Sequence, residues 1–216
     1  MSLYAELNGN RIVTGAIVLP FLGIWHADVL LDKTANISGS MMLTLGPLSM
    51  KCFPIIVGSF TGSVRVRVVG GAAGWRKKIP AKPYQHDLGV RKSTVIGDAA
   101  REVGETAKVD VDGVIGQAFI RQECPAARVL DQVGDPWWVR PDGVTEVGAR
   151  ATDEIKSHFD VVSAQLAIGQ LFVATDDVQD WTPARQFQTP TISIRTLSTV
   201  IHHIEKEKIR TEAWVG

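Results

Sequence analysis

Helical periodicity is confined to one stretch of this chain, residues 93–150, and this limits the possible folds more than any other feature. Apolar residues at helical spacing predict a first helix with Ser93 or Thr94 as its N-cap and Gly104 as a natural C-cap. A second, shorter helix is predicted from Pro125 to Gly134, because proline suits a first turn and glycine ends a helix. The two apolar stripes are formed by Val95, Ile96, Ala99, Ala100 and Val103, and by Ala126, Ala127, Leu130 and Val133.

A hairpin is predicted directly after the second helix. The segment WWVRPDGVTEVG alternates around Asp142-Gly143, a dipeptide that favours a tight turn between two strands. Strand-like sequence also separates the two helices. The stretch 93–150 is therefore expected to form one helix–strand–helix–hairpin module.

The remainder of the chain has the pattern of strands and turns. Before Gly71, turn signals recur roughly every eight to twelve residues, which is typical of a sandwich or barrel. In SVRVRVVGG, the valines Val64, Val66 and Val68 lie on one face of the predicted strand. The C-terminal segment STVIHHIEKEKIRTEAWV is predicted to be a hairpin about residues 205–208, because its β-branched residues outweigh its helix formers.

These patterns predict a mainly β protein with a small α+β unit, in which two barrel-like β domains flank the module. Four segments are expected. They are a β-barrel-like domain at 1–80, a basic and proline-containing linker at 81–92, the α+β module at 93–150, and a second barrel-like segment at 151–216 that ends in the hairpin. No tandem repeat is visible in the sequence.

The charge balance argues against a protein that grips nucleic acid. Lys and Arg total 23 and Asp and Glu total 23, so the formal charge is zero, and weak self-repulsion leaves the chain free to associate with copies of itself. The most apolar run, 12–31, is broken by Pro20 and Gly23 and falls short of a membrane span, and the N-terminus lacks the pattern of a signal peptide. Cys52 and Cys124 are expected to be buried free thiols of a protein that folds in cytoplasm.

The sequence contains no catalytic, cofactor or metal motif. The glycine cluster at 70–74 lacks the Gly-Lys-Ser/Thr ending of a phosphate loop and does not open a helix, so a turn is favoured over nucleotide binding. His202 and His203 are adjacent on a predicted strand and would point to opposite faces, which disfavours a shared metal ion. The aspartate pairs mostly lie in turns, where Asp is ordinarily structural.

Tryptophans provide the candidate interaction residues. Four of them lie at strand ends or in loops, where an amphipathic ring suits either a subunit interface or the edge of a core. Both interpretations stay open for each. With two exposed-face arginines, the candidate interface residues are Trp25, Trp75, Trp181, Trp214, Arg65 and Arg67.

The module and the C-terminal hairpin resemble a known family. AREVGE, FIRQECPAARVLDQVGD and WWVRPDGVTEVG are similar to the middle of baseplate and tail-hub proteins of contractile and long-tailed phages, a group that includes the late-control D family and the hubs of related secretion and injection devices. TVIHHIEKEKIRTEAWV resembles that family's late hairpin. The resemblance covers residues 93–150 and 198–215, with motif positions at Ala100, Glu102, Gly104, Arg121, Ala127, Leu130, Val139, Asp142, Gly143 and Val147.

The resemblance implies a structural virion protein and not an enzyme. In that family, two barrel-like domains per subunit repeat around a three-fold axis, and the resulting ring joins the tail tube to the central spike or tip. The implied partners are further copies in a homotrimer, the tail tube protein and the spike or tip proteins. DNA would meet the ring only in passage, no membrane would be bound, and the chain would be made in host cytoplasm and reside in the virion tail or baseplate. The chain is shorter than many members of the family. Edge strands of its two barrels are expected to pair with neighbouring copies.

Two other functions fit the same sequence. One is a carbohydrate- or cell-wall-binding virion module, with hydrolase activity carried by a carboxylate pair in an aromatic-lined cleft. The other is a β-rich adaptor of the cell. Association with a tail particle would separate the hub from the adaptor, and glycan binding would indicate the wall-binding module.

Overall fold

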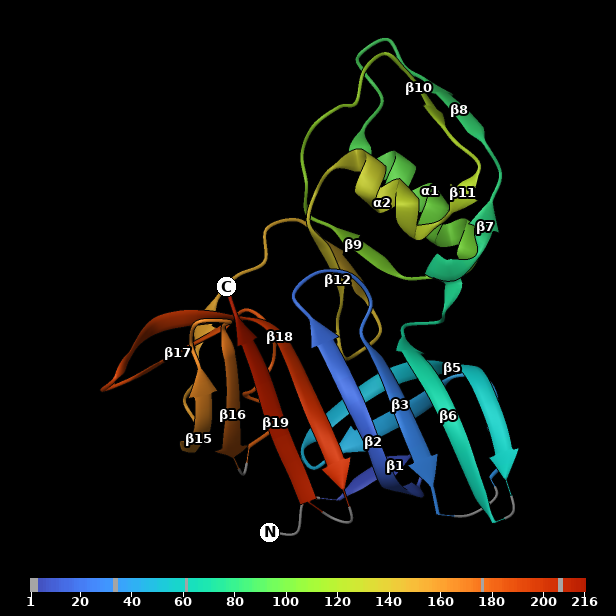
Figure 1. Ribbon diagram of the computed structural model, residues 1–216. Helices are drawn as coiled ribbons and strands as arrows, with labels where there is room; N and C mark the ends of the chain where they lie inside the picture. The colour runs from blue at the N-terminus through green and yellow to red at the C-terminus, as the bar shows by residue number, and fades with distance from the viewer. Residues whose placement is uncertain (1–3, 33–34, 61, 176, 206–207) are drawn as a thin grey trace.

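The computed structural model describes the chain except for residues 1–3, 33–34, 61, 176 and 206–207 (Figure 1). The described part is mainly β with two α-helices, which confirms the predicted fold class. In this part of the chain, no helix combines the length and apolarity needed to cross a membrane.

The N-terminal strands close into a six-stranded barrel. Their order is β1-β4-β5-β6-β3-β2, and pairing of β1 with β2 closes the ring. Alternation buries every second side chain inside the barrel, and the predicted valine face of β6 is confirmed there. The strands are β1 (Ala5–Leu7), β2 (Asn10–Pro20), β3 (His26–Leu31), β4 (Met41–Leu45), β5 (Leu48–Phe60) and β6 (Ser63–Gly70).

The C-terminal strands form a second curved sheet in the order β15-β16-β19-β18-β17-β14. Among its described residues, no hydrogen-bonded pairing joins β14 to β15, so this segment is barrel-like without a closing ladder. The predicted C-terminal hairpin is confirmed by pairing of Glu205 with Lys208, and its tip at 206–207 lies outside the described residues. The strands are β14 (Asp153–Glu154), β15 (Phe159–Gln165), β16 (Gln170–Thr175), β17 (Arg185–Thr189), β18 (Ile192–Glu205) and β19 (Lys208–Val215).

One ladder joins the two β segments into a continuous antiparallel sheet. The second half of β18 pairs with β2 through seven residue pairs, from Thr199–Pro20 to Glu205–Thr14. The sheet therefore runs β15-β16-β19-β18-β2-β3-β6-β5, and its two end strands lie on opposite sides of the molecule (Figure 1).

The two β segments repeat the same five-strand unit, a feature not visible in the sequence. The order β2-β3-β6-β5-β4 corresponds to β15-β16-β19-β18-β17. Register irregularities recur at equivalent places: Ile12/Thr14 matches Val161/Ser163, and Pro54/Ile56 matches Leu197/Thr199. The repeat cannot be recognised in the sequence because the two units share strand order and register irregularities but not residue identities at these positions.

Between the two segments, the module rises from one end of the sheet (Figure 1). Helix α1 ends at Gly104 and α2 ends at Gly134, both in left-handed backbone, as predicted. The predicted hairpin is confirmed as β12 paired with β13. The elements are η1 (Gly74–Arg76), β7 (Lys78–Ile79), β8 (Lys82–Gln85), α1 (Lys92–Val103), β9 (Ala107–Val109), β10 (Ala118–Arg121), β11 (Cys124–Pro125), α2 (Ala127–Val133), β12 (Trp137–Val139) and β13 (Thr145–Val147).

Both helix starts differ slightly from the predictions. The N-cap of α1 is Arg91 instead of Ser93, because a bridge between Arg91 and Val114 keeps the backbone extended up to that point. Pro125 lies in β11, paired with Lys78, so α2 begins after it. Local capping preference was overridden in each case by a strand contact from elsewhere in the module.

The segment 81–92, expected to be a linker, is instead part of the module. Strand β8 lies within it and pairs antiparallel with β10 over four residues. Just before it, β7 pairs with β11. β7 has two residues and β8 has four, and none of the four in β8 is fully buried, so neither strand shows an apolar alternation in the sequence, and Pro83 made a strand harder to predict.

Candidate functional site

The candidate metal-ligating histidines, His202 and His203, lie on β18. No group of three or more His, Cys, Asp or Glu side chains that could hold a metal ion occurs in that part of the chain. His202 and His203 do point to opposite faces, as predicted. The buried His202 ring lies 3.0 Å from the Thr211 hydroxyl, and burial lowers the pKa of His202 to about 4. On the other face, His203 Nε2 lies 2.8 Å from a carboxylate oxygen of Glu212.

The glycine cluster forms a turn that is already occupied by a carboxylate of the same chain. Glu105 accepts hydrogen bonds from the backbone N–H groups of Ala72, at 3.1 Å, and Gly74, at 2.6 Å. A Cβ at Gly74 would lie 2.4 Å from the Val103 carbonyl oxygen, so the close approach of this loop to the end of α1 requires glycine. These contacts favour the structural interpretation of the cluster over phosphate binding.

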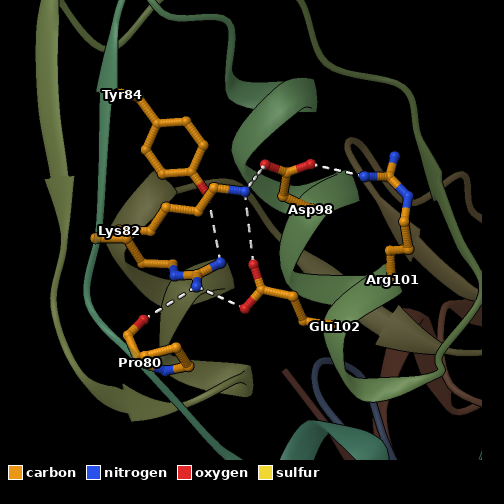
Figure 2. Close-up of polar contacts among 7 residues, drawn as sticks. Pro80, Lys82, Tyr84, Asp98, Arg101 and Glu102 are labelled. Atoms are coloured by element: carbon orange, nitrogen blue, oxygen red, sulfur yellow. Dashed lines mark hydrogen bonds and ion pairs between the residues drawn. The ribbon is translucent and has the colours of Figure 1, made fainter.

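A network of charges fastens the β8–β10 ribbon onto α1 (Figure 2). Lys82 Nζ lies 2.6 Å from Asp98, and this bond lowers the pKa of the Asp98 carboxyl. Arg121 is fully buried and donates to Glu102, at 2.7 Å, and to the carbonyl of Pro80, at 3.0 Å. Both carboxylates are held by cations from the ribbon. The network is therefore suited to holding the module together. In the sequence, Arg121 stands out only as a motif position of the family resemblance.

Three of the four candidate interface tryptophans belong to the core of this chain. Trp25, Trp75 and Trp181 are at most 2% exposed. Trp75 donates a 2.7 Å hydrogen bond to the Thr145 hydroxyl. The core interpretation, left open by the sequence, therefore holds for these three residues, and they have no surface to offer a neighbour in this conformation. Trp214 is half-buried.

The two candidate arginines lie together on the outer face of the continuous sheet. Arg65 and Arg67 are both exposed, and Arg67 forms a two-point ion pair with Asp28 on the adjacent strand, with distances of 2.8 and 2.7 Å. The hydrogen bond from Arg67 lowers the pKa of Asp28. Their role at an interface remains a prediction.

The two thiols differ in burial. Cys52 is fully buried in β5, and burial raises its pKa to about 12. Cys124 is free but only half-buried, because β11 is a two-residue strand beside the module surface. The expectation of a buried thiol therefore holds for Cys52 and not for Cys124.

An open groove lies on the second segment. It encloses about 700 Å³ over β15, β16 and β19, and Asp160 is the one carboxylate among its described lining residues. His158, Lys208 and Arg210 also line it, with Phe172 as its aromatic side chain. A glycosidase would place two carboxylates across such a cleft, and the described lining residues supply one.

Within the described residues, the continuous sheet that runs from β15 to β5 has an unpaired strand edge at each end. β5 pairs with β4 only through Leu48–Cys52, so the outer edge of its second half has no strand partner among the described residues. β15 pairs only with β16. Exposed apolar side chains accompany both edges, with Ile56 and Val57 on β5 and Val162 on β15. Exposed edge strands of this kind are sites at which another chain can pair.

Solved structures show where this fold occurs. A 43 kDa tail protein of prophage MuSo2 from Shewanella oneidensis is 8% identical, with a TM-score of 0.68 over 100% of this chain and 97% of that chain. A tail protein from Neisseria meningitidis is 12% identical, with a TM-score of 0.69 over 100% and 96%. An Escherichia coli component of the type VI secretion system, described as structurally similar to phage T4 tail proteins, is 10% identical, with a TM-score of 0.69 over 98% and 76%.

No protein-family model and no curated protein sequence matches the chain. At identities near one in ten, the structural similarities establish the fold and not the function. The chain has the fold of phage tail proteins. The resemblance stated from the sequence is thus confirmed at the level of fold.

Proposed function

We propose that this chain is a structural tail protein and a subunit of the hub ring that joins the tail tube to the central spike or tip. The observation that carries the proposal is the continuous antiparallel sheet, which spans both β segments and, among the described residues, has an unpaired strand edge at each end: the second half of β5 and the outer side of β15. A ring of copies would give both edges a partner and remove the aggregation risk that such edges carry.

The five-strand repeat supports this role. A subunit with two equivalent β units presents two similar surfaces, so three subunits around an axis can match six-fold partners on one side and three-fold partners on the other. Zero formal charge and the Arg67–Asp28 and His203–Glu212 pairs on the outer sheet face suit a ring through which DNA passes without being held. The proposed partners are the tail tube and spike or tip proteins, within a virion tail assembled after synthesis in host cytoplasm.

Light scattering on the purified protein, followed by negative-stain images of the same peak, tests the proposal. A trimer with a central hole is the expected result. If the protein is monomeric alone, the same measurement is repeated after mixing it with the tail tube and spike proteins of the same tail. A chain that stays monomeric under both conditions would contradict the proposed function.

A further inference from the structure

The outer face of the continuous sheet is hollowed at the same place in both β segments. In the first segment, a cavity of about 260 Å³ (the first hollow) lies over β2, β3 and β6, and its lining is Thr14, Gly15, Asp28, Val29, Leu30 and Arg65. In the second segment, the groove of about 700 Å³ described above (the second hollow) lies over β15, β16 and β19. These strands correspond to β2, β3 and β6 in the five-strand repeat, so the two hollows are equivalent in position.

Each hollow lies beside a register irregularity. The irregularity ends at Thr14 in β2 and at Ser163 in β15, and these two residues lie opposite Leu30 and Phe172. A bulge bends its strand and increases the local twist, so the sheet face beside it is not flat. Each hollow therefore combines a hydroxyl group with a half-buried apolar side chain.

One cross-strand row connects the two hollows. It runs through Arg65, Leu30, Thr14, Glu205 and Lys208, which are successive partners in the ladders. Residues directly opposite one another in a ladder point to the same side of the sheet, so both hollows open on one face. Arg65 lines the first hollow and Lys208 lines the second, four strand spacings away, or about 19 Å along the sheet.

Both hollows are near the end of the sheet that is farthest from the module. Strands β3 and β18 end there, and β6 and β19 begin there (Figure 1). Leu30, Arg65, Lys208 and Arg210 all lie within three residues of those strand ends. A protein stacked on this end of the subunit can therefore reach both hollows without meeting the module.

An arginine without a described partner stands in the first hollow. Arg65 is exposed, and within the described contacts its side chain forms no hydrogen bond or ion pair. The carboxylate of this hollow, Asp28, is bound by Arg67 at 2.7 Å. The hydrogen bond from Arg67 is the main cause of the lowered pKa of Asp28, to which Arg65 adds only through its charge. Arg65 is therefore available to a carboxylate of another molecule.

The second hollow has a corresponding cation, Arg210. It is exposed, and in the part of the chain that the structure describes its side chain has no hydrogen-bond or ion-pair partner. Its cross-strand neighbour on β18 is His203, which already contacts Glu212 at 2.8 Å. Asp160 is the one carboxylate of the described lining, against Lys208 and Arg210, so this hollow also keeps an unbalanced positive charge.

We propose that the two hollows are equivalent docking sites for acidic loops of a protein partner, each loop placing a carboxylate on Arg65 or Arg210. An unpaired guanidinium binds a carboxylate through two parallel, charge-assisted hydrogen bonds. Leu30 and Phe172 offer apolar contact to the rest of the loop. The inference rests on the proposed function for the identity of the partner. A homotrimer presents six such hollows, which suits one loop from each subunit of a six-fold tail tube ring.

The surface between the hollows favours a protein over a nucleic acid as the partner. Binding of a phosphate backbone takes a continuous track of cations. Here Thr14, Ala16 and the carboxylate of Glu205 lie on the strands that separate the two arginines. One acidic side chain at each hollow matches this pattern of separated positive charges.

Charge reversal at both arginines tests the proposal. Arg65→Glu combined with Arg210→Glu should keep the fold and the trimer, because both side chains are exposed, and should bind the purified tail tube protein about tenfold more weakly or worse. Interferometry measures the affinity and light scattering measures the trimer, under whichever condition gives the oligomer. In the matched control, Arg128→Glu is combined with Arg195→Glu. It makes the same change in net charge at exposed positions outside the described lining of either hollow and should bind like the wild type.

The single variants test whether the two hollows are equivalent. Arg65→Glu and Arg210→Glu should each weaken binding of the tube protein by a similar factor, and by less than the double variant does. Lysine at both positions keeps the charge and should cost less than reversal. If either single reversal binds as the wild type does, that hollow is not a docking site and the proposal of equivalent sites is wrong.

The outcomes separate the inference from the proposed function. A double variant that keeps both the trimer and its affinity for the tube protein would overturn the docking sites and leave the hub assignment standing. Loss of the trimer itself would also overturn them, because the hollows would then lie between copies. So would a variant that loses binding to duplex DNA while its binding to the tube protein is unchanged. A wild-type chain that binds no tube protein in any assembly state would overturn both.

Discussion

The closed barrel and the second β segment build the same five-strand unit, yet they finish it differently. In the barrel, β1 pairs antiparallel with β4 and closes onto β2. In the second segment, the corresponding short strand β14 pairs parallel with β17, and no described pairing links it to β15. The three-residue strand β1 therefore closes the first barrel, whereas β14 leaves the second segment open on one side.

The barrel is closed by the β1–β2 ladder, whereas the open second segment is stabilised by aromatic packing. Trp181 lies at its centre, with ring centroids 5.0 Å from Phe159 and 6.0 Å from Phe187. The contact with Phe159, on the free edge strand, is edge-to-face. This arrangement holds β15 in place from one side and leaves its backbone edge available to a neighbour.

Trp181→Ala should produce the largest loss of stability. Truncating a fully buried tryptophan removes apolar burial and leaves a cavity, for a cost of about 3–5 kcal/mol. Urea unfolding followed by circular dichroism measures the change. Trp214→Ala, at a half-buried position of the same segment, should cost far less. Equal costs would show that the aromatic cluster does not substitute for barrel closure.

Acid should weaken the second segment through His202. Its pKa is about 4 in the folded protein and about 6.5 when unfolded, so between these values the unfolded chain binds more protons. The free energy of unfolding is therefore unaffected by this group above pH 6.5. As the pH falls from 6.5 towards 4, the free energy of unfolding decreases by roughly 3 kcal/mol. Urea midpoints at pH 7 and pH 4.5 measure the loss.

The variant His202→Gln keeps a polar group near Thr211 and removes the titration. Acid also protonates carboxylates such as Glu212, whose pKa is lowered, so only the difference between wild type and variant reports on His202. The first barrel has Val64 where the second segment has Thr211, and it has no buried histidine among its described residues. If the variant loses as much stability in acid as the wild type, groups other than His202 cause the acid sensitivity.

Local features throughout the chain could be predicted from the sequence, whereas the pairing that connects the two β segments could not. The alternation in Val64–Val68, the C-caps Gly104 and Gly134, and the two hairpins all follow from spacing over a few residues. Pairing of 14–20 with 199–205 has no local signal, because any apolar edge of suitable length could fill that place. That pairing places β5 and β15 at the ends of the sheet, so the sequence alone could not show which strands have a free edge.

Tryptophan placement was ambiguous for a different reason. An indole ring suits a core and an interface equally well, and only the fold decides which surface covers it. Arg150 shows the same dependence on tertiary context. Nothing near it in sequence indicates that it would be half-buried and would donate its described hydrogen bonds to backbone carbonyls of both β segments.

The smallest predicted effect concerns the joint between the two regions, which is formed by Arg150. Its guanidinium donates to the carbonyl of Phe21, at the end of β2, and to that of Pro183, in the second segment, at 3.1 Å. It also lies over the rings of Phe21 and Trp138, at 5.3 and 5.0 Å. Burial lowers the pKa of Arg150 to about 10, which still leaves it charged at neutral pH.

Arg150→Lys keeps the charge and removes the planar fork, so a loss of about 1–2 kcal/mol is expected from the missing hydrogen bonds and stacking. Arg128→Lys, on the exposed side of α2, should be neutral. Calorimetry of Arg150→Lys shows whether the two β segments still unfold in one transition. A single transition at lower temperature means that the continuous sheet still couples the regions, whereas two separated transitions would mean that Arg150, and not the β2–β18 ladder, makes them unfold together.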